Sequence, residues 1–361
     1  MNTLLFLLTT MVAQGNPEFP CAEVAVTHYP ETVMPGDTIY VMVVAKNPHA
    51  ESVYINDTRF PGDILIYLKD AEGQQSTHSG KSMFSPMMPP PPDVEIILTF
   101  VEIKPGESRV LITTAVNVPS LVDLNALFWE KHLANLSTGD EKFSFCIDFK
   151  AYCAKGSGGG DSQPILHTLE MPIMMKQRPE KEMALIQKWN KTLFDYLESE
   201  QFQKSGVFGP KDNMPKNVAI KNDKFSHWYF VRMGNLYPNT SDIPGTWQGW
   251  KELEESMTPS TMRDEIRLTR MLIQYCDCDT EDAKVLTELK DWFKGMNEVQ
   301  RTVMAKNVCD LAWESRGTKL YEPYKKIYAT VREYDIAAKP DFMIKYLIDA
   351  GLLETPKAKP E

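Results

Sequence analysis

The spacing of apolar residues changes near Met175, and this change constrains the fold more than any other feature of the sequence. Before Met175, short β-branched and aliphatic runs alternate with turns rich in proline, glycine and aspartate, which is typical of β-strands. After Lys176, apolar residues recur at intervals of three and four, which is the period of an amphipathic helix. A chain of 361 residues is also longer than one hydrophobic core usually organises. The sequence therefore predicts an all-β domain followed by an all-α domain.

The front part contains a series of runs that are bounded by turn sequences. The clearest run, 38–44, is β-branched and apolar, and it directly follows a Pro-Gly-Asp turn at 35–37. Five more runs have the same character: 64–68, 94–103, 109–114, 143–152 and 165–171. The segment 121–136 is compatible with a short helix across the end of these strands. Strands of this length and spacing predict a β-sandwich.

The turns of the front part carry a resemblance to a known family. Pro35-Gly36-Asp37-Thr38-Ile39 leads into a strand that ends at Asn47, and Pro105-Gly106-Glu107-Ser108 follows later. Proline presets φ and glycine tolerates a positive φ, so such turns serve folding geometry. The pattern resembles immunoglobulin-like β-sandwich modules of uncharacterised exported bacterial proteins. The resemblance covers roughly the first half of the chain, residues 16–176, and implies a structural or interaction module without catalytic residues.

The back part, residues 177–354, is predicted to be an all-α helical bundle or a short helical stack. Its first helix begins after Pro179 and places five apolar residues on one face: Met183, Ile186, Trp189, Leu193 and Leu197. We expect an irregular aromatic excursion at 206–250, because no helical period continues there. Thr258 or Ser260 can cap the next helix, and the apolar spacing predicts four more helices after it. The tail 355–361 is expected to be loose.

Residues 1–15 have features of a signal peptide. An uncharged apolar run ends in Ala13-Gln14-Gly15, which puts small residues at the two positions that a signal peptidase inspects. The run is much shorter than the roughly 20 apolar residues of a membrane-spanning helix, and no later run reaches that length. Because Lys and Arg are missing before Leu4, a buried N-terminal strand or helix is the alternative. We expect an exported protein of the periplasm, cell surface or extracellular space, with no transmembrane segment in the mature chain.

The charge of the chain narrows the class of partner. The formal net charge is -10 at pH 7 and the sequence pI is about 5.3. This composition leaves no excess of cations to neutralise phosphates, so nucleic acid is not expected as a partner. A protein or a cell-envelope polysaccharide is the expected kind of partner.

Six cysteines divide three and three between the two parts: Cys21, Cys146, Cys153, Cys276, Cys278 and Cys309. Export favours disulfides, and three cysteines in each part leave one free thiol in each or require a bridge between the parts. Cys146 and Cys153 are seven residues apart and point to opposite faces of a continuous strand, so we expect Cys21 to pair with one of them. In the back part we expect a disulfide to Cys309. A redox pair or a zinc site with His227 is disfavoured by the acidic neighbours and by the missing fourth ligand.

An acidic stretch in the back part spaces oxygen ligands somewhat like a calcium loop. Its candidate ligands are Asp277, Asp279 and Glu281, with Glu288 at the twelfth position. A calcium loop needs glycine at its sixth position, where this chain has Asp282. The alternative is that these acids cap a helix and interact with the positive end of its dipole. Apart from this calcium site, no cofactor is predicted.

The densest group of aromatic residues comprises His227, Trp228, Trp247 and Trp250. If exposed, their rings could stack on sugars or anchor a protein partner. If buried, they form a hydrophobic plug that packs the irregular segment onto the helices or the sandwich.

Three functional hypotheses follow from these patterns. The leading one is an exported non-enzymatic binding or structural protein, because the catalytic signatures that a sequence can show are missing. The second is a hydrolase-like enzyme with a site at the interdomain junction, where His227 and the acids near Asp277 would be the first residues to inspect. The third is a glycan-binding protein, which requires Trp247 and Trp250 to be exposed and roughly coplanar.

Overall fold

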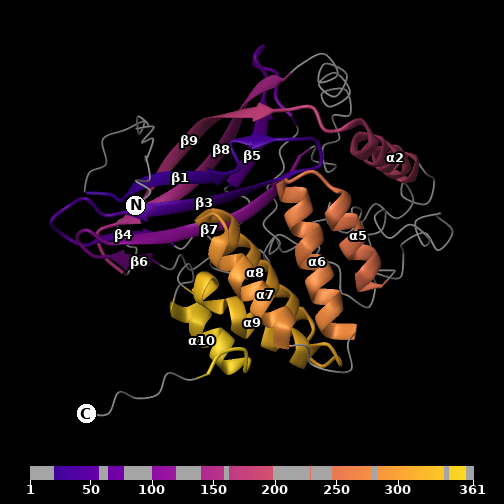
Figure 1. Cartoon of the computed structure of the whole chain (residues 1–361). Coiled ribbons are helices and arrows are strands. Elements are labelled where there is room, and N and C mark those ends of the chain that lie inside the picture. The colour runs from indigo at the N-terminus through magenta and orange to yellow at the C-terminus, as the bar shows by residue number, and fades with distance from the viewer. Residues whose placement is uncertain are drawn as a thin grey trace. The chain divides into compact units, whose positions relative to one another are not determined.

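The computed structural model describes residues 20–56, 64–76, 100–118, 140–157, 162–197, 228, 246–277, 283–336 and 341–354. Within these ranges, nine strands precede seven helices (Figure 1). The N-terminal strands lie in sheets and the C-terminal elements are helices, in agreement with the change of period near Met175.

The chain divides into two compact units, and each contains more than one segment of the sequence. The first, the strand unit, comprises Met1–Thr32, Ile39–Val116 and Asp123–Met175. The second, the helical unit, comprises Val33–Thr38, Asn117–Val122 and Lys176–Glu361. Two short segments of the front half thus belong to the same compact unit as the helices.

A three-stranded sheet contains β1 (Glu23–Tyr29), β3 (Thr38–Lys46) and β7 (Ser108–Asn117), which lie side by side in the order β1-β3-β7 (Figure 1). β1 pairs antiparallel with β3, with Glu23 opposite Lys46. β3 is the middle strand, which explains its continuous apolar run, because neighbours cover it along both edges. Its buried apolar residues are Ile39, Tyr40, Val41, Val43 and Ala45.

The second sheet has the strand order β2-β9-β8-β4-β6, and β5 also pairs with β8. These strands are β2 (Thr32–Val33), β4 (Val53–Asn56), β5 (Ile64–Lys69), β6 (Phe100–Ile103), β8 (Glu141–Ala154) and β9 (Ser162–Met175). β8 and β9 pair antiparallel along their whole length, from Glu141 opposite Met175 to Ala154 opposite Ser162. On β8, the alternate residues Phe143, Phe145 and Ile147 are buried, so one face of the hairpin contributes to the core.

A disulfide between Cys21 and Cys153 joins the residues before β1 to the end of β8, with a Cα–Cα distance of 6.0 Å. The expected pairing of Cys21 with one of the two strand cysteines is therefore confirmed. Because β8 is continuous, Cys146 lies on the face opposite to Cys153, and it is a buried free thiol.

Asn47 fastens the end of β3 to the second proline-glycine turn. Its side-chain nitrogen donates to the carbonyl oxygens of Glu51 and Ile103, each at 2.8 Å, and its backbone carbonyl accepts from Gly106 N at 2.9 Å. The turns that motivate the resemblance therefore connect neighbouring strands. The strand orders of the two sheets do not by themselves identify an immunoglobulin-like sandwich, which stays a prediction. The segments 94–99 and 121–136 lie outside the described residues.

The helices of the described chain are α2 (Glu180–Leu197), α5 (Trp247–Ser256), α6 (Thr261–Asp277), α7 (Ala283–Gly295), α8 (Glu298–Glu314), α9 (Tyr321–Ile336) and α10 (Asp341–Asp349). α2 begins directly after Pro179, as predicted. Ser260 caps α6, because its hydroxyl accepts from Arg263 N at 3.3 Å, whereas Thr258 binds elsewhere. α5 packs beside α6, and α9 packs against α7 and α8 (Figure 1).

α5 corrects the expectation of an irregular excursion up to residue 250. Thr246 caps this helix, with its hydroxyl oxygen accepting from Gly249 N at 3.4 Å. The apolar residues Trp247, Trp250, Leu253 and Met257 recur at spacings of three and four, which is a helical signal that the aromatic composition concealed. No helix in the described ranges combines the length and the apolar character that a membrane crossing requires.

Gly36 provides a test of how closely the turn before β3 approaches the helices. Its φ is +87°, and an added Cβ would lie 2.8 Å from Ile186 Cδ1 and 3.0 Å from Met262 Sδ. We expect Gly36→Ala to lower the free energy of unfolding by about 2–4 kcal/mol, since left-handed strain and overpacking add together. Urea unfolding followed by circular dichroism measures the loss.

Gly317→Ala is the matched control, because Gly317 also has a positive φ, +80°, and no atom lies within 4 Å of its added Cβ. This variant should lose only the conformational part, about 1–2 kcal/mol. Equal losses for the two variants would contradict the close approach at Gly36.

Candidate functional site

The aromatic residues singled out in the sequence mostly lie in a hydrophobic core of the helical unit. Trp228 is 2% exposed and Trp250 is 0% exposed, and their rings meet edge to face with centroids 6.3 Å apart. Trp228 Nε1 donates to Thr269 Oγ1 at 2.9 Å, and Trp247 packs partly buried against the same core. The expectation of an exposed indole pair at Trp247 and Trp250 is therefore wrong, because the apolar side of α5 packs inward. His227 lies outside the described residues.

The acidic residues proposed as calcium ligands are described only in part. Glu288 on α7 forms ion pairs with two arginines of α6, at 2.7 Å to Arg270 and 3.3 Å to Arg267. Asp279 and Glu281, and the side chain of Asp277, lie outside the described residues. The part of the chain that the structure describes contains no group of three or more His, Cys, Asp or Glu side chains arranged to hold a metal ion. The calcium site stays a prediction.

The cysteines of the helical unit differ from the expected pairing. Cys276 and Cys309 are both free thiols, so a disulfide between them is wrong. Cys309 is buried on α8, where it interacts with the hydroxyl of Tyr328 on α9, and that hydroxyl donates to Asp335 Oδ2 at 2.7 Å. Burial, together with the charge of Asp335, raises the pKa of Tyr328. Cys278 lies outside the described residues.

Cys146 in the strand unit is a thiol of low reactivity. Burial raises its pKa to about 11, and the negative charge of Glu170 on the adjacent strand adds to the effect. A thiol with such a pKa stays protonated at neutral pH, whereas nucleophilic attack and metal binding need the thiolate. We therefore interpret Cys146 as a core residue.

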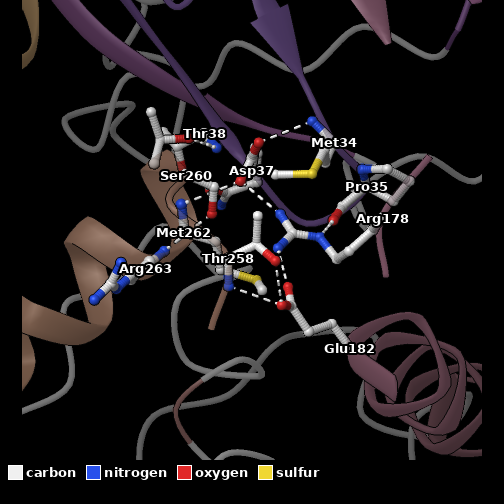
Figure 2. A network of polar contacts seen from close by, with 12 residues as sticks. Met34, Pro35, Asp37, Thr38, Arg178, Glu182, Thr258, Ser260, Met262 and Arg263 are labelled. Carbon is white, nitrogen blue, oxygen red and sulfur yellow. Dashed lines mark hydrogen bonds and ion pairs between the residues drawn. The ribbon is translucent and has the colours of Figure 1, made fainter. Parts of the chain in front are cut away.

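The most completely built polar site of the described chain surrounds the guanidinium of Arg178 (Figure 2). Arg178 lies just before α2, and its side chain is 0% exposed. Its Nε donates to the carbonyl oxygen of Pro35 at 2.6 Å, its Nη2 to Asp37 Oδ1 at 2.6 Å, and its Nη1 to Glu182 Oε2 at 2.7 Å. One cation thus binds the turn at 34–37 and the first turn of α2. We call these residues, with the groups described next, the Arg178 cluster.

The carboxylate of Asp37 connects this cluster to the start of α6. Its Oδ1 also accepts from Met262 N at 3.2 Å, and its Oδ2 accepts from Met34 N at 2.8 Å (Figure 2). Beside it, Thr38 N donates to Thr261 Oγ1 at 2.9 Å. A carboxylate at a helix N-terminus is favourable, because it accepts a hydrogen bond from a backbone N–H that has no partner within the helix and lies at the positive end of the helix dipole.

Glu182 completes the Arg178 cluster on the side of α2. Its Oε1 accepts from both the backbone N and the hydroxyl of Thr258, at 2.8 and 2.7 Å (Figure 2). Burial by itself would raise the pKa of Glu182, but the hydrogen bonds from Thr258 and Arg178 outweigh it and lower the pKa. Glu182 is therefore ionised at neutral pH, and its stabilising effect is lost as the pH falls below the ordinary carboxyl range.

The Arg178 cluster acts as a fastening of three segments of the helical unit. Two buried carboxylates surround one buried guanidinium, and hydrogen bonds within the cluster engage both oxygens of each carboxylate. Such an arrangement holds its members in one geometry, since a buried charge that loses its partner is very costly. The chemistry that the cluster supports is positioning of the turn 34–37, α2 and α6.

Sequence reasoning missed this site because it interpreted Pro35-Gly36-Asp37 as a turn and nothing more. One signal was available in the sequence. Arg178 lies at the start of a predicted helix, where a positive charge is unfavourable to the helix dipole, and Glu182 follows four residues later. An arginine in such a place indicates a specific negatively charged partner, although its identity cannot be read from the spacing.

A second ion-pair cluster links α5, α6 and α7. Arg270, which is 5% exposed, donates through Nε to Glu254 Oε2 at 2.9 Å and through Nη2 to Glu288 Oε1 at 2.7 Å. Arg267, one turn earlier on α6, pairs with the same two glutamates and lies over the ring of Trp292 at 5.0 Å. The hydrogen bond from Arg270 lowers the pKa of Glu288, against a smaller opposing effect of burial.

No protein-family model and no curated protein matches this chain. Solved structures give matches of low similarity. The sporulation control protein Spo0M from Bacillus subtilis is 14% identical over 50% of this chain and 56% of its own, with a TM-score of 0.23. A β-glucosidase from Listeria innocua in complex with gluconolactone is 12% identical over 43% of this chain and 16% of its own, with a TM-score of 0.18.

A third match is PapD-like domain 7 of human CEP192, which is 10% identical over 47% of this chain and 94% of that domain, with a TM-score of 0.19. The chain thus spans 56% of Spo0M and 16% of the β-glucosidase. At these TM-scores, no conclusion about the fold or the activity of this chain is drawn from the matches.

Replacing Arg178 tests the fastening role of the cluster. Arg178→Met keeps much of the side-chain volume but leaves Asp37 and Glu182 buried without their cation. We expect the free energy of unfolding to fall by about 3–5 kcal/mol, as it does when one partner of a buried ion pair is removed. Urea unfolding followed by tryptophan fluorescence suits this test, because every tryptophan except Trp129 lies within Lys176–Glu361.

Lys251→Met is the control, because Lys251 and Glu255 form an ion pair with the same i,i+4 spacing as Arg178 and Glu182, but their side chains are 53% and 62% exposed. It should lose at most about 1 kcal/mol. In the double variant Asp37→Asn/Arg178→Met, the loss should be smaller than the sum of the single losses. Additive losses would contradict direct coupling of the two charges.

Proposed function

We propose that this chain is an exported, non-enzymatic binding or structural protein whose front half is an immunoglobulin-like β-sandwich. The observation that carries the proposal is the disulfide between Cys21 and Cys153, which closes a loop with a sequence separation of 132 residues. Disulfides form and persist mainly in oxidising compartments, outside the cytosol. The apolar run before Ala13-Gln14-Gly15 supports the same location.

The use of buried charge supports a scaffold role. Arg178 is committed to Asp37 and Glu182, and Arg270 is committed to Glu254 and Glu288. Each of these charges holds two segments of the chain together. Groups that act on a substrate usually keep some hydrogen-bonding capacity for it, whereas these groups are engaged with one another. A binding or structural role agrees with this arrangement, with a protein or a cell-envelope polysaccharide as the expected partner.

Processing and oxidation of the expressed protein test the location. The mature chain in the exported fraction should begin at Asn16, and alkylation under non-reducing conditions should leave Cys21 and Cys153 unmodified. N-terminal sequencing and mass spectrometry measure the two outcomes, and a Cys21→Ser/Cys153→Ser variant identifies the protected pair. A chain that stays in the cytosol with residues 1–15 attached and both cysteines alkylated would overturn the proposal.

Capture of a partner tests the binding role. The immobilised full chain, incubated with an envelope or secreted fraction, should retain a specific protein, glycan or wall component, and the reduced and unfolded chain should not. Failure to retain any such component, from a sample in which the disulfide is intact, would count against a binding protein.

A further inference from the structure

Asp264 lies in the first turn of α6 and ties this helix to α8. Its Oδ2 accepts from Gln300 Nε2 at 2.7 Å, and Gln300 is 2% exposed. The hydrogen bond is therefore made in a nearly water-free place. A carboxyl group keeps an oxygen that can accept such a bond whether it is ionised or protonated.

The charges around Asp264 are predominantly negative. Glu265, the next residue on α6, is 3% exposed, and Asp37 of the turn at 34–37 acts on Asp264 from the start of the helix. Arg267 is the cation that acts on Asp264, and it is shared with Glu254 of α5 and Glu288 of α7. From α8, Asp264 receives only the uncharged amide of Gln300 among the contacts described.

The charge of Arg178 does not offset this excess, because its guanidinium is already bound by Asp37 and Glu182. Ionised Asp264 thus adds a negative charge to a partly buried place where three carboxylates compete for one shared arginine. Protonation would remove that charge and preserve the hydrogen bond to Gln300.

We propose that Asp264 is a proton-binding group that makes the helical unit more stable in mild acid than at neutral pH, by relieving charge repulsion at the start of α6. The pKa of Asp264 agrees with this role: burial raises it to about 6 from the ordinary 3.8, although the hydrogen bond from Gln300 and the charge of Arg267 oppose the rise.

The direction of the pH dependence follows from the raised pKa. Because the folded chain holds the proton more tightly than the unfolded chain, the stabilisation is fully present below about pH 4 and is lost as the pH rises toward the folded pKa near 6. A difference of roughly two pKa units corresponds to a change of about a hundredfold in the unfolding equilibrium constant over the whole range. This is opposite to Glu182 and Glu288, whose lowered pKa values make their stabilisation fail in acid.

Asp264→Asn tests the proposal in the full chain, since asparagine keeps an accepting oxygen for Gln300 and carries no charge. Urea unfolding is followed by tryptophan fluorescence at pH 5.0 and pH 7.5. The ratio of the folding constant of Asp264→Asn to that of the wild type should rise about tenfold between these two pH values. A ratio that is flat or falls would overturn the proposal.

Two controls keep the result specific. Asp291→Asn on the exposed side of α7 should give a ratio that does not change with pH. Burial lowers the pKa of His28 in β1, so His28 destabilises the strand unit in acid, but it is present in every variant and cancels in the ratio. If Asp264→Asn does not fold, the side-chain amide resonances of Gln300 in the wild type give a second measurement. They should titrate with a midpoint near pH 6, and a midpoint below about 4.5 would overturn the proposal.

Discussion

The guanidinium of Arg178 is the group on which the arrangement of the helical unit depends most. It is completely buried, and it reaches the carbonyl oxygen of Pro35 and the carboxylates of Asp37 and Glu182 within 2.7 Å. Desolvating such a cation costs several kcal/mol, and only well-placed partners offset that cost. The turn at 34–37 and the start of α2 must therefore adopt one particular geometry around it. Residues from the front of the chain become part of the helical unit for this reason.

α6 is the helix in which the polar clusters of the unit meet. Its first backbone N–H groups face Asp37, its first turn presents Asp264 to Gln300, and further along it Arg267 and Arg270 bind acids of α5 and α7. The same helix contributes Met262, Ile266 and Ile273 to the core around Trp228 and Trp250. Polar positioning and apolar burial thus act along one helix, and the stability of α6 depends on both.

Much of the secondary structure could be predicted from the sequence, because its causes are local. β3, β5, β7, β8 and β9 lie where β-branched runs between turns predict strands, and α2 begins after Pro179. The pairing of Cys21 could be narrowed to two partners by the alternation of side chains along one strand. α5 was missed, since its tryptophans suggested a special segment while their spacing of three indicated a helix. The back-half cysteines could not be resolved, because a pairing between helices depends on packing that no local pattern encodes.

The sequence by itself determined where strands give way to helices, since the period of apolar residues and the positions of proline and glycine act over a few neighbouring residues. Only the tertiary structure decided what the polar residues do. Asp37 binds Arg178 across 141 residues, and Thr38 binds Thr261 across 223. The chain does not announce such partners, because a buried ion pair forms only where folding brings both charges out of water together. The same packing buried Trp228 and Trp250, which in the sequence had the composition of an exposed binding surface.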